Sequence, residues 1–357
     1  MNRYLNIDGV AIHDQSDCYV IAEIGNNHQG NLDKCKEMFR VAKECGANAV
    51  KLQKRDNRSL YTKAAFDKPY EHENSFGSTY GEHREYLEFG QGEYQELKEY
   101  AAQIGITFFA TAFDFPSADF LAALDMPLYK IASGDVKNIP LIKYIASFNK
   151  PMIVSTGGAT LEDVQRVYEE IMPINPQLCI LQCTASYPAS FEELDLKVIQ
   201  TYQEIFPEIN VGLSSHDNGI AMAVAAYVLG ARVIEKHFTL NRALKGTDHA
   251  FSLEPTGLRK MVRDLRRTRE ALGDGQKKVY LSERPAVMKM GKKLVAAQDL
   301  PAGHILTKAD LQIKCPGDGI PPYELDQVVG KMLTESLGVD EAIAWTKLTE
   351  KVETAVM

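Results

Sequence analysis

The sequence predicts an α/β protein, a (β/α)8 TIM barrel followed by a small β-rich C-terminal domain. Eight short runs rich in β-branched and other apolar residues recur along the chain, each followed by a segment with helical spacing. Most of these runs are almost continuously apolar, which is typical of parallel strands covered on both faces. Eight such units in about 270 residues match the length of a (β/α)8 barrel.

The expected strands span residues 18–25, 49–53, 106–113, 128–134, 151–157, 178–184, 209–215 and 232–238. Asn31 is a good cap for the first helix, which would bury Met38 and Phe39 and stop at Gly46. Two further helices should stop at Gly105 and Gly273. An open doubly wound sheet is the alternative, but it would carry a G-x-G-x-x-G turn, which this sequence lacks.

After the eighth unit the strand–helix pattern ends. We assign residues 1–275 to the barrel, 276–291 to a linker and 292–357 to a second domain of short strands and turns. So short a domain is marginal alone and should pack on something larger. Within the barrel, residues 54–89 are too many for an ordinary strand-to-helix connection, and long loops at the strand ends are usually functional.

Composition excludes several classes of protein. The 40 basic and 48 acidic residues give a net charge of −8, which argues against a nucleic-acid partner. The N-terminus has no apolar signal core, and the longest apolar run, 220–229, is half the ~20 residues that a membrane span needs. The six cysteines form no Cys-x-x-Cys pair and are expected to be buried free thiols. We therefore expect a soluble cytoplasmic protein without a membrane or nucleic-acid partner.

The carboxyl ends of the strands should meet at one mouth of the barrel, so polar residues there are the candidates for chemistry. In chain order they are Glu23, Lys51, Gln53, Thr111, Lys130, Ser133, Asp135, Ser155, Thr156, Thr184, Ser186, Tyr187, Ser214, Ser215, His216 and His237. A barrel whose mouth is purely structural would not need two lysines, two histidines and so many hydroxyls.

Strands seven, eight and one become neighbours when the barrel closes, which brings His216, His237 and Glu23 face to face. Two imidazoles and a carboxylate with open positions suit a divalent transition metal. Each histidine taken alone would more often be structural, and we interpret the other six histidines in that way.

Lys51 and Lys130 lie inside apolar runs, where an unpaired ammonium is costly. They would either be buried beside a carboxylate or form an anion site with Ser133, Ser155 and Ser214 as hydroxyl donors. We favour the anion site. The basic residues of 258–272 are interpreted instead as a solvated helix face.

Ordered motifs along nearly the whole chain resemble those of the sialic acid synthases, which use phosphoenolpyruvate to make nine-carbon nonulosonic acids. They are AEIGNNHQG (22–30), KLQ (51–53), YKIASGD (129–135), QCTASYP (182–188), GLSSH (212–216), EKHFTL (235–240) and KGTDHAFSLEP (245–255). The tail, with KKLVAAQDLPAGHILTKADL and PGDGIPP, resembles the antifreeze-like (SAF) domain of these enzymes. Residues 74–89 resemble the animal and related bacterial branch.

The resemblance implies a condensation. Carbon 3 of phosphoenolpyruvate would attack the aldehyde of an open-chain N-acetylmannosamine-type sugar, water would add at C2, and the C–O bond would break to release phosphate. It also implies a domain-swapped homodimer in which the SAF domain covers the partner's site.

The resemblance further implies a role for each site residue. His216 and His237 would hold Mn²⁺, with Mg²⁺ or Co²⁺ as alternatives, and Glu23 would assist proton transfer or the attacking water. Phosphoenolpyruvate would be held by Lys51, Thr111, Lys130, Ser133, Ser155 and Ser214. The sugar would be contacted by Asp135, Tyr187 and Asp248, and Gln53 would also bind substrate.

Two departures from the family pattern leave the acceptor sugar open. Cys315 replaces an Arg that many bacterial members direct at the N-acyl group, and Ala185 replaces an Asn in the strand-six motif. Asp135 stands where many bacterial members have Glu, and this shorter carboxylate is expected to keep the same role. The acceptor could therefore carry an N-acetyl group, a bare hydroxyl, a 6-phosphate or two acetamido groups. A related condensation onto another aldose phosphate is the alternative within enzymes. A catalytically inactive sugar- or ice-binding protein is disfavoured, because the polar strand ends are intact.

Overall fold

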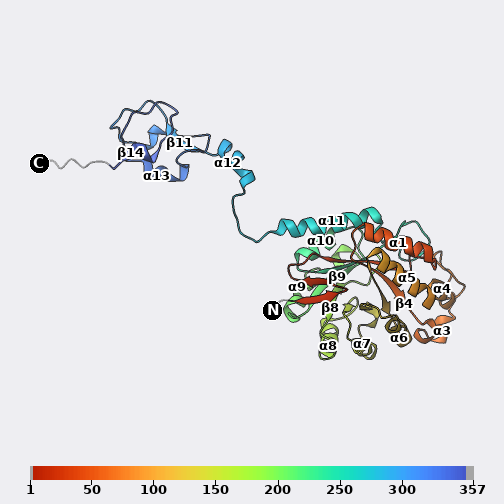
Figure 1. Cartoon of the computed structure of the whole chain (residues 1–357). Helices are drawn as coiled ribbons and strands as arrows, with labels where there is room; N and C mark the ends of the chain where they lie inside the picture. Colours follow the sequence, from red (N-terminus) through yellow and green to blue (C-terminus); the bar gives the residue numbers. More distant parts are fainter. Residues whose placement is uncertain (1–2, 351–357) are drawn as a thin grey trace. The chain divides into compact units, whose positions relative to one another are not determined.

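The computed structural model describes residues 3–350, which form two compact units that divide between Gly273 and Asp274. The first unit is a closed barrel of eight parallel strands in the order β10-β3-β4-β5-β6-β7-β8-β9. This confirms the predicted barrel (Figure 1). The strands are β3 Tyr19–Gly25, β4 Ala49–Lys54, β5 Thr107–Ala112, β6 Tyr129–Ile131, β7 Met152–Ser155, β8 Leu178–Cys183, β9 Asn210–Ser215 and β10 Val233–His237.

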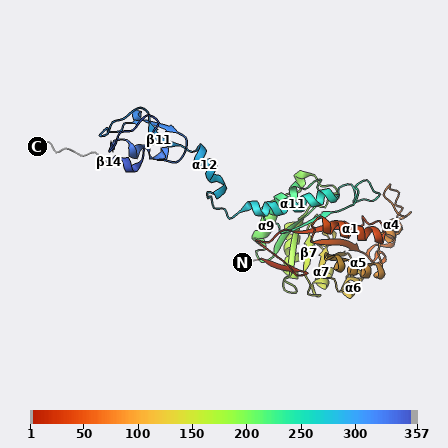
Figure 2. The ribbon, with the colours of Figure 1, turned by 45° about the horizontal axis from the view of Figure 1, so that its top comes forward.

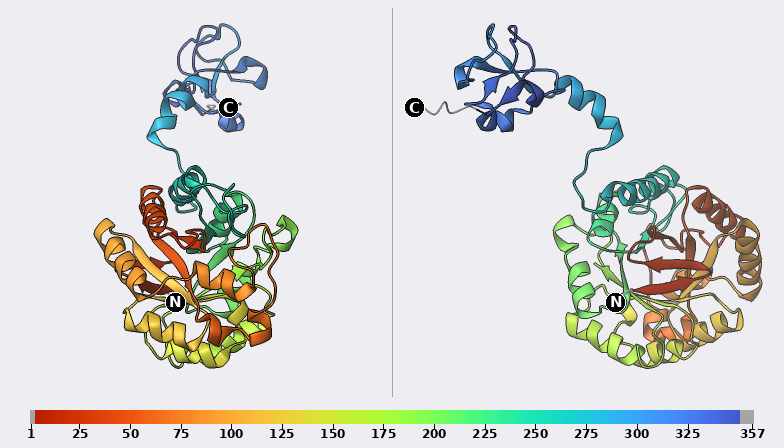
Figure 3. Two further views of the ribbon diagram at one scale, coloured as in Figure 1. Left: turned by 90° about the vertical axis from the view of Figure 1, so that its right-hand side faces the viewer. Right: turned by 60° about the vertical axis from the view of Figure 1, so that its left-hand side comes forward.

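Each barrel strand is followed by a helix, and the helices form a ring around the strands (Figure 3, right). Their bounds are α1 Leu32–Glu44, α5 Gln91–Ile104, α6 Phe115–Ala123, α7 Ile139–Ala146, α8 Leu161–Ile171, α9 Val198–Ile205, α10 Ala221–Val228 and α11 Pro255–Leu272. Figure 2 shows α1, α5, α6 and α7 along the outside of the barrel.

The helix ends follow the expected local chemistry. The Asn31 side chain accepts a hydrogen bond from the Lys34 amide and caps α1, which buries Met38 and Phe39. Helix α5 ends at Gly105, whose φ of 70° is the left-handed conformation that glycine adopts without strain. The arginines and lysines of α11 are exposed, as predicted for a solvated face.

A hairpin that the sequence did not predict closes the amino end of the barrel. Its strands, β1 Tyr4–Ile7 and β2 Val10–His13, pair antiparallel. Leu5, Ile7 and Ile12 join a buried cluster with the inward side chains of the barrel strands. The side-chain amide of Asn210, at the start of β9, donates a hydrogen bond to the Ile12 carbonyl. The hairpin therefore covers the amino end of the barrel, and the open site lies at the carboxyl end.

The long 54–89 connection folds into three short helices, α2 Asn57–Leu60, α3 Lys63–Phe66 and α4 Tyr80–Leu87. In α4 the Thr79 hydroxyl and the Glu82 carboxylate form a capping box. The connection is therefore an ordered part of the first unit.

The second unit has its own small core, which includes Leu294, Leu306 and Ile343. Its strands pair as two antiparallel hairpins, β11 Lys293–Ala296 with β12 Leu311–Lys314 and β13 Met332–Leu333 with β14 Leu348–Thr349. It also contains helix α13 Leu325–Val328. The stretch expected as a linker, 276–291, includes the exposed helix α12 Arg284–Met290. Residues 351–357 of the predicted second domain lie outside the described residues.

Five cysteines are buried free thiols as expected, but Cys315 is exposed. That part of the prediction is wrong because Cys315 lies directly after β12, an edge of a two-stranded sheet, rather than in the barrel core. Within the described part of the chain, the helices include none that could cross a membrane.

Candidate active site

A cavity of about 320 Å³ opens where the carboxyl ends of the barrel strands meet. Most residues predicted for the site line it. Those that do not are Asp135, Thr156, Thr184, Ser186 and Ser215. The predicted residues on its wall are Glu23, Lys51, Gln53, Thr111, Lys130, Ser133, Ser155, Tyr187, Ser214, His216, His237 and Asp248. The side chain of Asp135 instead accepts a hydrogen bond from the Asn138 amide at 3.3 Å.

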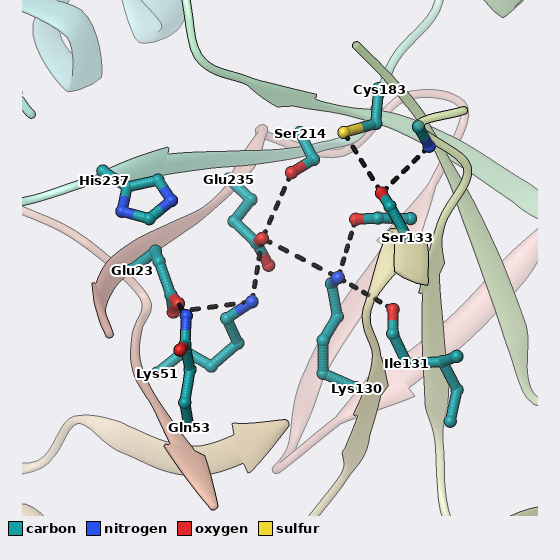
Figure 4. A network of polar contacts seen from close by, with 12 residues as sticks. Glu23, Lys51, Gln53, Lys130, Ile131, Ser133, Cys183, Ser214, Glu235 and His237 are labelled. Atoms are coloured by element: carbon teal, nitrogen blue, oxygen red, sulfur yellow. Dashed lines mark hydrogen bonds and ion pairs between the residues drawn. The ribbon is translucent and has the colours of Figure 1, made fainter. Parts of the chain in front are cut away.

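A buried carboxylate, Glu235, organises the floor of the cavity (Figure 4). Its Oε1 lies 2.8 Å from Nζ of Lys51 and 3.8 Å from Nζ of Lys130, and accepts a hydrogen bond from the Ser214 hydroxyl at 3.2 Å. Burial alone would raise the pKa of Glu235, but Lys130 and Lys51 outweigh it and lower that pKa to about 2. Both lysines are therefore buried beside a carboxylate and also line the cavity.

Lys130 forms hydrogen bonds with a hydroxyl group and a backbone carbonyl. Nζ of Lys130 donates to Oγ of Ser155 at 2.6 Å and to the Ile131 carbonyl at 3.0 Å. Burial lowers the pKa of Lys130 to about 8, against the attraction of Glu235. Next to it, the Ser133 hydroxyl accepts a hydrogen bond from the Gly157 amide at 2.9 Å. Ammonium, amide and hydroxyl donors are thus concentrated on one wall, as an anion requires.

Glu23 lies between this floor and the histidines. Its Oε1 accepts a hydrogen bond from the Gln53 amide at 2.7 Å, and its Oε2 is 3.4 Å from Nζ of Lys51. Burial raises the pKa of Glu23 to about 7, although Lys51 acts in the opposite direction. A carboxyl group with this pKa exchanges its proton near neutral pH, which suits a general acid or base.

The two predicted histidines face each other with ring centroids 5.4 Å apart. The register explains this arrangement, since His237 on β10 pairs with Glu23 on β3, and His216 directly follows the neighbouring β9. Nδ1 of His216 lies 2.8 Å from the Thr184 carbonyl, so this nitrogen carries the proton and Nε2 keeps its lone pair. Burial lowers the pKa of His237 to about 3 and lowers that of His216.

This pair meets the chemical requirements of a metal site. Both imidazoles are neutral, and the carbonyl at Nδ1 of His216 is the kind of outer partner that orients ligating histidines. Nδ1 of His237 is buried without a hydrogen bond, and its closest carboxylate oxygen, Oδ2 of Asp248, is 3.8 Å away. Residues 3–350 hold no cluster of three or more histidine, cysteine or acidic ligands, so substrate or water would complete the coordination of an ion here.

Three charged residues of the cavity were not predicted from the sequence: Glu235, Arg55 and Arg84. Glu235 could have been found, because it precedes His237 by two residues and a strand directs such a pair to the same side. Arg84 lies in α4, far from any strand end, and only the folding of the 54–89 connection brings it to the cavity.

Comparison with known proteins agrees with this geometry. The model of the NeuB family matches residues 38–277, and that of the SAF domain matches residues 293–349. The chain is 42% identical to the N-acetylneuraminate-9-phosphate synthase of Homo sapiens over 331 residues, which is 92% of either chain. It is 36% identical to the N,N'-diacetyllegionaminic acid synthase of Legionella pneumophila over 334 residues, covering 92% of this chain and 94% of that one.

Among solved structures, the N-acetylneuraminic acid synthetase of Leptospira borgpetersenii superposes with a TM-score of 0.70 at 30% identity, covering 80% of this chain and 96% of that one. The chain therefore belongs to the NeuB family and carries a SAF domain, which confirms the resemblance seen in its motifs. It is an enzyme of the class that condenses phosphoenolpyruvate with a sugar.

Proposed function

We propose that this enzyme condenses phosphoenolpyruvate with the open-chain aldehyde of an N-acylmannosamine-type hexose, giving a nine-carbon nonulosonic acid and phosphate. The observation that carries the proposal is the meeting, in one cavity of a NeuB-family barrel, of a buried lysine–hydroxyl wall with two neutral imidazoles and the Glu23 carboxyl group.

Phosphoenolpyruvate would lie against the lysine–hydroxyl wall. Lys51 and Lys130 supply two ammonium groups for a single fully ionised neighbour, Glu235, so the wall can accept further negative charge. The hydroxyls of Thr111, Ser133, Ser155 and Ser214 line the same cavity as these lysines and would donate hydrogen bonds to the phosphate or carboxylate oxygens.

The reaction forms a bond between C3 of phosphoenolpyruvate and the aldehyde carbon. Water adds at C2, the C2–O bond breaks, and the bridging oxygen leaves with the phosphate. The added water becomes the C2 carbonyl oxygen and loses both of its protons. In the overall balance one proton goes to the aldehyde oxygen and the other to the leaving phosphate. Glu23, with its raised pKa, can give or take either proton, while Gln53 holds one of its oxygens in place.

His216 and His237 would hold the metal ion, which we propose to be Mn²⁺, with Mg²⁺ and Co²⁺ as alternatives. Such an ion supplies Lewis acidity toward the aldehyde oxygen. Gln53, Tyr187 and Asp248 line the remaining wall and would contact the sugar hydroxyls. For Asp135, whose side chain bonds Asn138 and is not on the cavity wall, the sugar contact stays a prediction.

We also propose that the working form is a domain-swapped homodimer and that it acts in the cytoplasm. The free state of all six cysteines agrees with a reducing compartment. The proposed homodimer and the proposed cytoplasmic location both rest on the family to which the chain belongs.

The direct test is phosphate release from phosphoenolpyruvate with Mn²⁺ and a panel of acceptors. The panel holds N-acetylmannosamine, mannose, the 6-phosphates of both and a diacetamido hexose, and products are identified by mass spectrometry. We expect stoichiometric phosphate and a nine-carbon acid with at least one acceptor. Phosphate release that needs no acceptor, or no turnover with any of them, would contradict the proposal.

A further inference from the structure

Two arginines at the mouth of the cavity have no role in the chemistry described so far. Arg55 directly follows β4, and Arg84 lies in α4 of the long connection. Both side chains line the same cavity as the histidines and lysines.

Arg55 is almost fully buried, with 7% of its surface exposed, yet its charge is incompletely paired. Nη2 donates to Oε1 of Gln53 at 2.6 Å, and the guanidinium lies over the ring of Phe113 at 4.0 Å. Nη1 is buried without any hydrogen-bond partner, and the nearest carboxylate oxygen, on Glu88, is 3.8 Å away. Because an unused buried donor is costly, this nitrogen is poised to receive an acceptor from a ligand.

Arg84 adds a second guanidinium without a carboxylate. Its Nε and Nη2 donate to the hydroxyl of Tyr80 at 3.1 and 2.9 Å. In the described part of the chain, no acidic oxygen comes within 4.0 Å of its nitrogens. Burial first, and then the charge of Arg84, lower the pKa of Arg55, so the two guanidinium groups are close enough to repel each other. Glu88 is also shared with Lys54 at 3.2 Å, which leaves positive charge in excess.

Arg55 lies farther toward the carboxyl end of β4 than Lys51, which belongs to the lysine–hydroxyl wall. Lys51, Gln53 and Arg55 are alternate residues that direct their side chains to the same cavity. At about 3.3 Å per residue, Arg55 lies roughly 13 Å along the chain from Lys51. Glu23, on the neighbouring strand, bonds Gln53 between them, so a sugar whose aldehyde meets Glu23 and the histidines would extend its far carbons toward the arginines.

We propose that Arg55 and Arg84 bind a phosphate group on the acceptor carbon farthest from the aldehyde, so that the physiological acceptor is a hexose 6-phosphate. The inference rests on the proposed function and specifies its substrate class. Guanidinium groups match phosphate oxygens with paired, charge-assisted hydrogen bonds, and a phosphate oxygen would give the buried Nη1 of Arg55 the acceptor that it lacks.

The test compares kcat/KM for N-acetylmannosamine 6-phosphate and for N-acetylmannosamine at saturating phosphoenolpyruvate. We expect the wild-type enzyme to prefer the phosphorylated sugar by on the order of 100-fold. Arg55→Gln and Arg84→Gln should each reduce this preference about 10-fold or more, through a higher KM for the phosphorylated sugar, and Arg84→Lys should retain part of it. The matched control is Arg58→Gln, whose side chain is 69% exposed in the same connection and which should keep the wild-type ratio.

A wild-type preference for the unphosphorylated sugar, or an equal loss of kcat/KM for both sugars in the arginine variants, would overturn the inference while leaving the proposed function intact. Absence of turnover with either sugar would overturn the proposed function instead. Calorimetric binding of the two sugars to wild-type enzyme with phosphoenolpyruvate then still decides the inference: tighter binding of the phosphorylated sugar supports it, and equal affinity overturns it.

Discussion

At the scale of single residues, the protonation of the two histidines is set by their immediate surroundings. The Thr184 carbonyl fixes the tautomer of His216, and burial keeps His237 neutral. A neutral ring with a free nitrogen lone pair is the ligand form of histidine, so both residues are prepared for a cation without any change of protonation.

Replacing His216 therefore tests the metal site. In His216→Ala we expect turnover to fall by at least about 100-fold, since loss of even an outer partner of a metal ligand costs 10- to 100-fold. Mn²⁺ binding, followed by the electron paramagnetic resonance of the free ion, should weaken in parallel. The exposed His72→Ala is the control and should match wild type in both. Unchanged Mn²⁺ affinity in His216→Ala would refute the ligand assignment.

Glu235 shows how a buried charge can be structural as well as functional. It is the shared partner of two buried ammonium groups, so Glu235→Gln leaves both of them under-compensated. We expect this change to lower the free energy of unfolding of the barrel by about 3 to 5 kcal/mol.

Urea denaturation followed by circular dichroism measures this loss. Glu44→Gln removes an exposed partner of Arg40 in α1 and should cost no more than about 0.5 kcal/mol. Similar urea midpoints for Glu235→Gln and Glu44→Gln would show that Glu235 does not stabilise the barrel.

At the scale of secondary structure elements, the sequence predicted what periodicity and local chemistry determine. All eight barrel strands lie at the expected positions, and α1, α5 and α11 stop at the expected glycines. The hairpin β1–β2 was not predicted, because each of its strands has only four residues. Its burial depends on the end of the barrel that it covers rather than on its own hydrophobic pattern.

The second unit offers a prediction of pH dependence. The buried Asp310 accepts hydrogen bonds from His304 at 2.9 Å and from the amide and hydroxyl of Thr307 at 2.8 and 2.6 Å. The His304 contact and the Thr307 contacts lower the pKa of Asp310 well below its usual range. A lowered carboxyl pKa stabilises the fold above the unfolded-state pKa of about 4, and this contribution disappears as the pH falls.

Asp310→Asn should therefore destabilise the second unit most at neutral pH, and the difference from wild type should shrink as the pH falls below about 4. The only tryptophan of the chain, Trp345, lies in this unit, so its fluorescence reports the unfolding of the unit separately from the barrel. A difference between variant and wild type that stays constant with pH would contradict this account of Asp310.

At the scale of the whole molecule, the site exists because a closed barrel brings distant segments to one mouth. Residues 23 and 237 are more than 200 positions apart in the sequence, yet the register pairs them directly. This convergence follows from the fold class, which is why the strand-end residues could be predicted from the sequence. Arg55 could have been found in the same way, because it follows Gln53 by two residues at the end of β4. Arg84 could not, because its placement depends on how the 54–89 connection folds, which no periodic pattern encodes.

An isotope label on the bridging oxygen of phosphoenolpyruvate tests the proposed condensation directly. Wild-type enzyme, Mn²⁺ and the preferred acceptor are supplied with phosphoenolpyruvate carrying ¹⁸O between C2 and phosphorus. We expect one ¹⁸O-labelled phosphate for each nine-carbon acid formed, because the C2–O bond breaks. Label retained in the organic product, or labelled phosphate released without a new carbon–carbon bond, would contradict it.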